Sequence, residues 1–251
     1  MRYFLFLAYD GSAYHGWQYQ PNAVSVQETI QKCLSLLLQR ETTVVGAGRT
    51  DTGVHARHMA AHFDTDTEFS AEERRNLVHR LNLVLPPDIA IHDLRPVTPE
   101  AHARFSALSR TYKYYVHTAK DPFVRAYSDR EYWQLDLDLM NEAASRLFDF
   151  SDFTSFAKLH TDTKTNICRI MQAHWDETAP GEYVFTIQAD RFLRNMVRAI
   201  VGTMFMVGRG KLSVPDFCAT IQRHDRCAAG DSAPACALFL EDVEYPDSIF
   251  L

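Results

Sequence analysis

Short apolar runs and amphipathic helices alternate in one order along the chain, and this order limits the fold more than any other feature of the sequence. In the first half, runs with the composition of strands cover Arg2 to Asp10, Thr42 to Val45, Met59 to Asp64 and Ile89 to Leu94. Ser-x-x-Glu capping boxes at Ser25 and Ser70 predict the starts of two helices between these strands. The resulting order, β-α-β-β-α-β, is that of a ferredoxin-like unit.

The second half of the chain has the same order of elements, without a repeat of the sequence itself. Strands are predicted over 109–118, near Tyr132, and over 167–177, 182–190 and 237–245. Helices are predicted over 137–149, 191–207 and 214–222. We therefore predict an α+β fold of two ferredoxin-like halves, residues 1–104 and 105–251, with a mostly antiparallel central sheet and a catalytic cleft between the halves.

Composition excludes several classes of protein. The 251 residues are 46% hydrophobic and 23% charged, which is ordinary for a globular protein and too apolar for a disordered one. No apolar run reaches the length of about 18 residues that a membrane span needs, so we expect no membrane partner. The run from Tyr3 to Tyr9 ends without a small-residue cleavage site, so we expect no signal peptide. Five cysteines without a Cys-x-x-Cys pair indicate reduced thiols in a cytoplasmic protein.

Charge is distributed unevenly along the chain. The net charge of −6 by itself argues mildly against nucleic acid as a partner. Residues 101–130 nevertheless carry six Lys or Arg against two Asp, and residues 190–211 carry five against one. Two such segments can form one cationic surface for a polyanion or two separate solvated faces, and the sequence leaves both open.

The stretch from Gly46 to Ala56 is polar, rich in glycine and without apolar periodicity, which predicts a loop. It does not match phosphate-binding loops, because Asp51 stands where a dinucleotide-binding loop has its third glycine and the Gly-Lys-Ser/Thr ending of a P-loop is missing. Asp51-Thr52-Gly53 is the triplet of aspartic proteases, but those enzymes use two such carboxylates, so this chain would need a symmetric dimer. A plain turn with an Arg49–Asp51 ion pair is a further alternative.

The same loop also has the composition of a catalytic site. A neighbouring guanidinium such as Arg49 favours the ionised form of a carboxylate, and an ionised Asp51 can form a covalent adduct or accept a proton. His55, His58 and His62 follow closely, but no further residue continues them at metal-ligand spacing. We therefore expect no metal and interpret these histidines as ordinary hydrogen-bonding residues.

The loop and several other segments together resemble the tRNA pseudouridine synthase A family. Gly48 to Ala56 looks like the catalytic loop of the family, and Phe192 to Arg198 matches its helical F-L-x-x-M-V-R motif. Further matches, in the order of the family, are Tyr9 to Gln18, Val26-Gln27, Arg104 to Ala107, Ser109 to Tyr114, Phe153-x-x-Phe156 and Ala233-Pro234-Ala235. The resemblance spans nearly the whole chain, although Ala237 stands where the family usually has Gly and the stretch from His160 to Thr165 is less similar than its surroundings.

The resemblance implies an enzyme that isomerises uridine to pseudouridine at positions 38, 39 and 40 in the anticodon stem-loop of tRNA. In this reaction the base is cut at its N1–C1′ bond, turned and rejoined through C5, without a metal or a cofactor. Asp51 corresponds to the catalytic carboxylate of the family. Three roles remain open for it: attack on the base, attack on the sugar, or abstraction of a sugar proton.

Four further residues are carried over from the family as substrate-binding residues. Arg49 would hold the extruded nucleotide or fill the space that it leaves, and Tyr112 would stack on the uracil. Arg198 would pair with Asp51, and Leu238 would cover the other face of the base. Packing of Tyr112 against Tyr114 and a solvated position for Arg198 are the structural alternatives.

The resemblance also implies tRNA as the partner and a homodimer. The two basic segments, both in the second half, would then contact tRNA phosphates. A catalytically silent RNA-binding protein of the same architecture and a dimeric aspartyl hydrolase remain as alternatives. Asp51, Arg49 and Tyr112 occur together, which argues against the silent protein.

Overall fold

The computed structural model describes residues 1–158 and 164–251, so most of the stretch from His160 to Thr165 lies outside the described residues. The described residues form two compact units. Unit 1 consists of Met1–Leu108 and Leu240–Leu251, and unit 2 of Ser109–Phe239. Each unit combines helices with mostly antiparallel strand pairs, which confirms the predicted α+β class.

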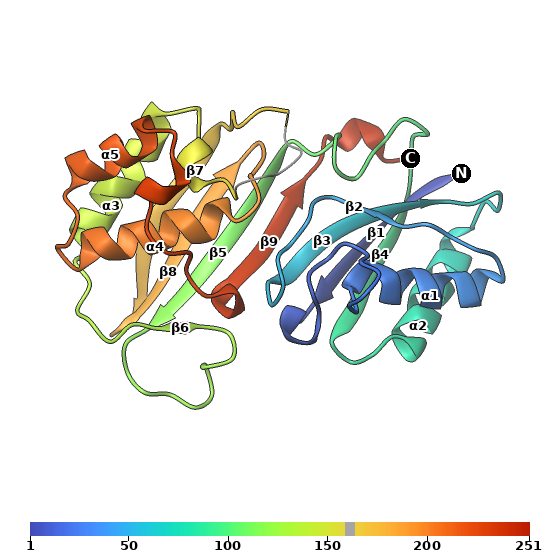
Figure 1. The fold of residues 1–251 in the computed structure, drawn as a ribbon. Helices are drawn as coiled ribbons and strands as arrows, with labels where there is room; N and C mark the ends of the chain where they lie inside the picture. Colours follow the sequence, from blue (N-terminus) through green and yellow to red (C-terminus); the bar gives the residue numbers. More distant parts are fainter. Residues whose placement is uncertain (159–163) are drawn as a thin grey trace. The chain divides into compact units, whose positions relative to one another are not determined.

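Unit 1 follows the predicted order β-α-β-β-α-β (Figure 1). Its elements are β1 (Arg2–Tyr9), α1 (Val26–Leu38), β2 (Val45–Gly46), β3 (His55–Asp64), α2 (Ala71–Val84) and β4 (Ile89–Val97). β1 pairs antiparallel with both β3 and β4, in a register that sets Leu5 opposite Ala61 and Leu94. All three of these side chains are buried, so the apolar runs of the sequence form the core of this unit.

The end of the chain belongs to unit 1, whereas the predicted division assigns it to the second half. The last strand, β9 (Leu238–Glu244), begins with two residues of unit 2 and continues in unit 1. There the Asp242 carboxylate lies 2.6 Å from His58 Nδ1, and the Tyr245 hydroxyl donates to the Ala103 carbonyl at 2.5 Å. These contacts join residues far apart in the sequence, and they hold residues 240–251 in unit 1.

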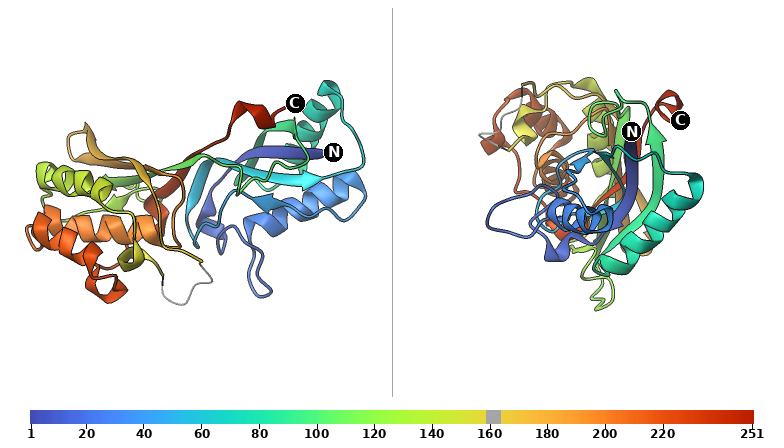
Figure 2. Two further views of the ribbon diagram at one scale, coloured as in Figure 1. Left: turned by 90° about the horizontal axis from the view of Figure 1, so that it is seen from above. Right: turned by 90° about the vertical axis from the view of Figure 1, so that its right-hand side faces the viewer.

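Unit 2 contains the strands and helices that follow. They are β5 (Ser109–His117), β6 (Asp129–Arg130), α3 (Leu137–Arg146), β7 (Ile170–Ala179), β8 (Glu182–Ala189), α4 (Met196–Gly208) and α5 (Val214–Gln222). β8 pairs antiparallel with β5 and β7, and β6 pairs parallel with β5. In the view from above, α3, α4 and α5 lie on one side of β7 and β8 (Figure 2).

One predicted capping box is incomplete, and one helix start differs from the prediction. Ser25 caps α1, but the Glu28 carboxylate pairs with Lys32 at 2.6 Å, whereas the capping box predicted at Ser70 is complete. α4 begins at Met196 instead of Arg191, because Asn195 has a left-handed backbone (φ 68°) that an α-helix cannot continue through.

Candidate active site

The loop that carries Asp51 connects β2 and β3 in unit 1, as predicted, and its backbone is held by the segment that follows β1. The Trp17 amide donates to the Thr50 carbonyl at 3.3 Å, and the Tyr9 hydroxyl lies 2.9 Å from Thr50 Oγ1. Inside the loop, the Val54 amide donates to the Asp51 carbonyl at 3.1 Å. The backbone on both sides of Asp51 is therefore fixed, while its side chain is half-exposed.

Two glycines allow this close contact between segments. A Cβ on Gly11 would lie 2.0 Å from the Val54 carbonyl oxygen, and a Cβ on Gly16 would lie 2.3 Å from the Thr50 carbonyl oxygen. Gly16 also has a φ of 88°, in the left-handed region. Any larger residue at these two positions would push the Asp51 loop away from the segment that supports it.

His55 is part of this support. Its ring is almost fully buried, and its Nδ1 lies 3.0 Å from the Gly11 amide nitrogen and 3.0 Å from Asp10 Oδ1. The Gly11 amide donates to Nδ1, which ties the ring to the segment that follows β1. Asp10 Oδ1 in turn accepts from the Ser12 amide at 2.9 Å.

The three histidines near the loop have separate partners. His55 Nδ1 lies 3.0 Å from the Gly11 amide nitrogen, whereas His58 Nδ1 lies 2.6 Å from Asp242 Oδ1. His62 accepts from the Ala103 amide at 3.1 Å, and burial lowers its pKa to about 4. Within residues 1–158 and 164–251, no group of His, Cys, Asp or Glu side chains has the arrangement of a metal site.

Arg49 is exposed on the same loop, two residues before Asp51. A guanidinium in this place lies outside the core and can reach a phosphate or a base at the surface. The loop therefore presents a half-exposed carboxylate and an exposed cation from one rigid backbone.

The other predicted site residues belong to unit 2. Tyr112 lies on β5, and its ring meets Phe192 edge to face with centroids 5.2 Å apart. Arg198 lies in the first turn of α4, where its Nε donates to the Ala233 carbonyl at 2.7 Å and its own carbonyl accepts from the Ala233 amide at 3.0 Å. Leu238 is buried at the start of β9.

The sequence does not single out one polar pair of unit 2. The buried Tyr114 hydroxyl donates to Asp129 Oδ2 at 3.0 Å, and burial raises the pKa of both groups. The positive charge of Arg198 acts in the opposite direction on the pKa of Tyr114. The only sign of this pair in the sequence is that Tyr112 and Tyr114, two residues apart, lie on the same face of β5.

The structure thus brings Asp51 and Arg49 together in unit 1, and it places Tyr112, Arg198 and Leu238 in unit 2. Their combination in one site, including the Asp51–Arg198 pair, stays a prediction.

Among the described residues, no helix has the length and apolar character of a membrane span.

Comparison with known proteins identifies the family. A family model described as tRNA pseudouridine synthase matches residues 143–246. The chain is 58% identical over 249 residues to tRNA pseudouridine synthase A of Bacteroides fragilis, an alignment that covers 99% of the chain and 98% of that protein. The chain belongs to the tRNA pseudouridine synthase A family.

Other members of the tRNA pseudouridine synthase A family show the same extent of similarity. The protein of that name from Bacteroides thetaiotaomicron is 59% identical over 251 residues, covering 99% of the chain and 92% of the relative. The one from Bacillus subtilis (strain 168) is 38% identical over 243 residues, covering 95% and 97%. The similarity thus extends over the Asp51 loop and β5, which lie outside the range matched by the family model.

Proposed function

We propose that this chain isomerises uridine to pseudouridine in tRNA. The observation that carries the proposal is full-length similarity to proteins named tRNA pseudouridine synthase A. The loop geometry supports it, because the chemistry needs one positioned carboxylate and the Asp51 backbone is held on both sides.

The reaction breaks the N1–C1′ bond of the nucleotide and forms a C5–C1′ bond. N1 gains a proton and C5 loses its hydrogen as a proton, so the isomerisation is redox-neutral and consumes no co-reactant. We assign Asp51 as the catalytic carboxylate, acting on the base, on the sugar, or on a sugar proton. All three routes share the loss of the C5 hydrogen, which makes this hydrogen the best reporter of activity.

The finer parts of the proposal concern the substrate and its contacts. We assign the target as positions 38, 39 and 40 of the anticodon stem-loop. Arg49 holds the extruded nucleotide, Tyr112 stacks on the uracil and Leu238 covers its other face. Arg198 pairs with Asp51, and its hydrogen bond to Ala233 supports this role because it fixes the direction of the guanidinium.

We further propose that the enzyme works as a homodimer in the cytoplasm. All five cysteines are described residues and are free thiols, as expected in a reducing compartment. Sedimentation of the purified chain tests the dimer: a monomer at micromolar concentration would refute it.

Tritium release from C5-tritiated uridine in a tRNA transcript tests the activity. We expect release by the unaltered chain and none by Asp51→Ala. Asp66→Ala is the matched control, because Asp66 is fully exposed in unit 1 and its surface ion pair with Arg40 contributes little. Binding of tRNA without any release would support the silent RNA-binding protein instead, and release by Asp51→Ala would remove Asp51 from the mechanism.

A further inference from the structure

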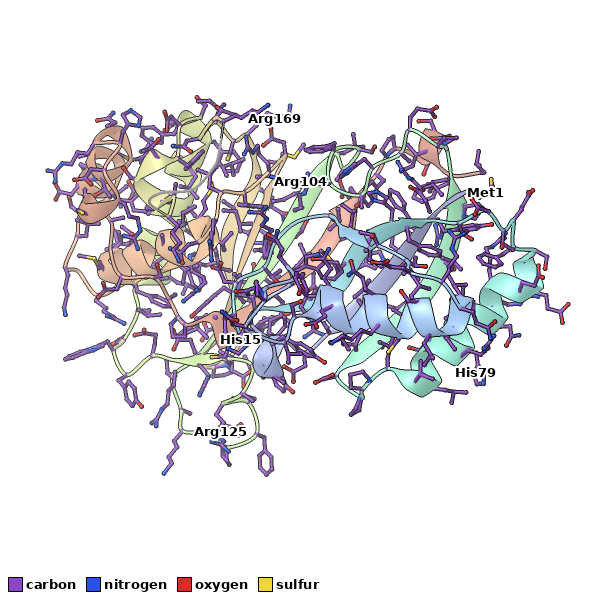
Figure 3. All side chains as sticks on the ribbon, turned by 45° about the vertical axis from the view of Figure 1, so that its right-hand side comes forward. Met1, His15, His79, Arg104, Arg125 and Arg169 are labelled. Atoms are coloured by element: carbon purple, nitrogen blue, oxygen red, sulfur yellow. The ribbon has the colours of Figure 1, made fainter. Side chains whose placement is uncertain are left out.

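Unit 2 carries exposed aromatic rings that have no place in the proposed catalytic site, and the cations near them belong to the two basic segments expected to contact tRNA phosphates. Phe123 is 89% exposed, Tyr132 77% and Trp133 61%, which is unusual for such large rings. Arg125 extends from the loop between β5 and β6, away from the sheet (Figure 3). We call the following set the aromatic–cation strip: Phe123, Arg125, Arg130, Tyr132, Trp133 and Lys211.

The backbone that carries Tyr132 and Trp133 is tied to the rest of unit 2, whereas the turn at Phe123 is held by a local hydrogen bond. The Phe123 amide donates to Asp121 Oδ1 at 2.7 Å, and the Glu131 amide donates to the His117 carbonyl at 2.9 Å. Further along, the Asp136 amide donates to the Gly208 carbonyl at 2.9 Å, which brings this segment to the end of α4. The exposed rings therefore stand on defined backbone.

Two rings of the strip lie beneath cations. The Arg130 guanidinium lies 4.6 Å from the centre of the Tyr132 ring, and the Lys211 ammonium lies 5.7 Å from the centre of the Trp133 ring. Both rings are mostly exposed, so each offers part of a ring face to solvent beside its cation. A base can stack on that face while the cation contacts the adjacent phosphate.

The carboxylates of the same segment are used internally. Glu131 is 6% exposed and accepts from Arg209, and Asp129 accepts from the Tyr114 hydroxyl at 3.0 Å. Asp121 accepts from the Phe123 amide. The segment 120–133 has equal numbers of acidic and basic residues, but the charged residues that it leaves exposed are Lys120 and Arg125, whereas Asp121 and Asp129 are partly buried.

We propose that the aromatic–cation strip is a second RNA-contacting surface, which binds unpaired nucleotides of tRNA by stacking and phosphate contacts. The proposal rests on the tRNA substrate of the proposed function. A polyanion fits this surface because a cation accompanies each of two exposed rings, while Glu131 and Asp129 are paired with Arg209 and Tyr114 within unit 2.

Tryptophan fluorescence tests the contact directly. Trp17 and Trp175 are 2% and 3% exposed, so acrylamide quenches mainly Trp133. We expect saturating tRNA to protect this fluorescence from acrylamide, in the unaltered chain and in Asp51→Ala alike, and the protected signal to be absent in Trp133→Phe. Full acrylamide access with tRNA bound would overturn the proposal, whether or not the chain is active.

Kinetics with a double variant measures the contribution of the strip. We expect Tyr132→Ala/Trp133→Ala to raise the KM for tRNA by about tenfold or more, with kcat unchanged, since each stacked base contributes about 1–3 kcal/mol. Phe148→Ala is the matched control, because Phe148 is a half-exposed aromatic of unit 2 outside the strip. An unchanged KM would refute the proposal. A raised KM would also refute it if sedimentation showed that the double variant no longer self-associates as the unaltered chain does.

Discussion

Gly16 is the position where one added methyl group should disturb the catalytic loop most. An alanine Cβ there would lie 2.3 Å from the Thr50 carbonyl oxygen, so that oxygen must retreat by about 1 Å to reach ordinary contact. The overlap costs about 1–3 kcal/mol. The φ of 88° adds about 1–2 kcal/mol for a residue with a Cβ. We therefore expect Gly16→Ala to lower the free energy of unfolding by about 2–5 kcal/mol.

Two other glycines separate these contributions. Gly210 has a left-handed φ of 67° and no atom within 4 Å of the place that a Cβ would take, so Gly210→Ala carries the conformational cost alone. Gly48 also has open space and its φ is not left-handed, so Gly48→Ala should be neutral or stabilise by about 0.4–1 kcal/mol. Urea unfolding of the three variants gives the free energies for this comparison.

Activity gives the second measurement on the same variants. Because a displacement of about 1 Å in a catalytic group can reduce the rate about 100-fold, Gly16→Ala should lower kcat at saturating tRNA by roughly that factor. Gly210→Ala, which lies outside the Asp51 loop, should keep the kcat of the unaltered chain. If Gly16→Ala matched Gly210→Ala in both stability and kcat, the close contact between Gly16 and Thr50 would have no consequence and the reasoning would fail.

Two further predictions concern buried ionisable groups. The pKa of His62 in the folded chain is about 4, below the ordinary value of 6.5, so the folded state favours the neutral ring. Stability is therefore lost as the pH falls from about 6.5 towards 4. The free energy of unfolding, measured across this range, should depend less on pH in His62→Gln. Glu131 is buried and pairs with Arg209, so Glu131→Ala leaves a half-buried guanidinium without its carboxylate. We expect this variant to lower the free energy of unfolding in urea by about 2–3 kcal/mol. The double variant Glu131→Ala/Arg209→Met should recover part of that loss.

Local patterns in the sequence predict most of the secondary structure, because caps and apolar periodicity act over a few residues. Ser70 and its capping box fix the start of α2, and the apolar run at Arg2 becomes β1. The start of α4 differs from the prediction because the left-handed backbone of Asn195 depends on its surroundings. The placement of residues 240–251 in unit 1 depends on contacts such as Asp242 with His58, which no local pattern encodes.

The candidate site shows the same division. The composition of the Asp51 loop indicates a catalytic residue, but the sequence does not show that Gly11 and Gly16 support the loop backbone from a distance in the chain. The numbers of charged residues in a segment say less about the binding surface than the loop composition says about the catalytic residue. They do not distinguish Glu131, which is buried against Arg209, from a carboxylate at the surface. Exposure therefore decides which charges a partner meets.

Both parts of the proposed machinery are positioned by backbone contacts within their own units. In unit 1 the Thr50 and Asp51 carbonyls accept hydrogen bonds on either side of the catalytic carboxylate, and in unit 2 Ala233 binds both the side chain and the carbonyl of Arg198. Groups held in this way lose little freedom when the substrate binds, which favours the transition state and therefore kcat. Substitutions in these supports should consequently lower kcat, whereas substitutions in the exposed aromatic–cation strip should raise KM, and this contrast separates the chemistry from the binding of tRNA.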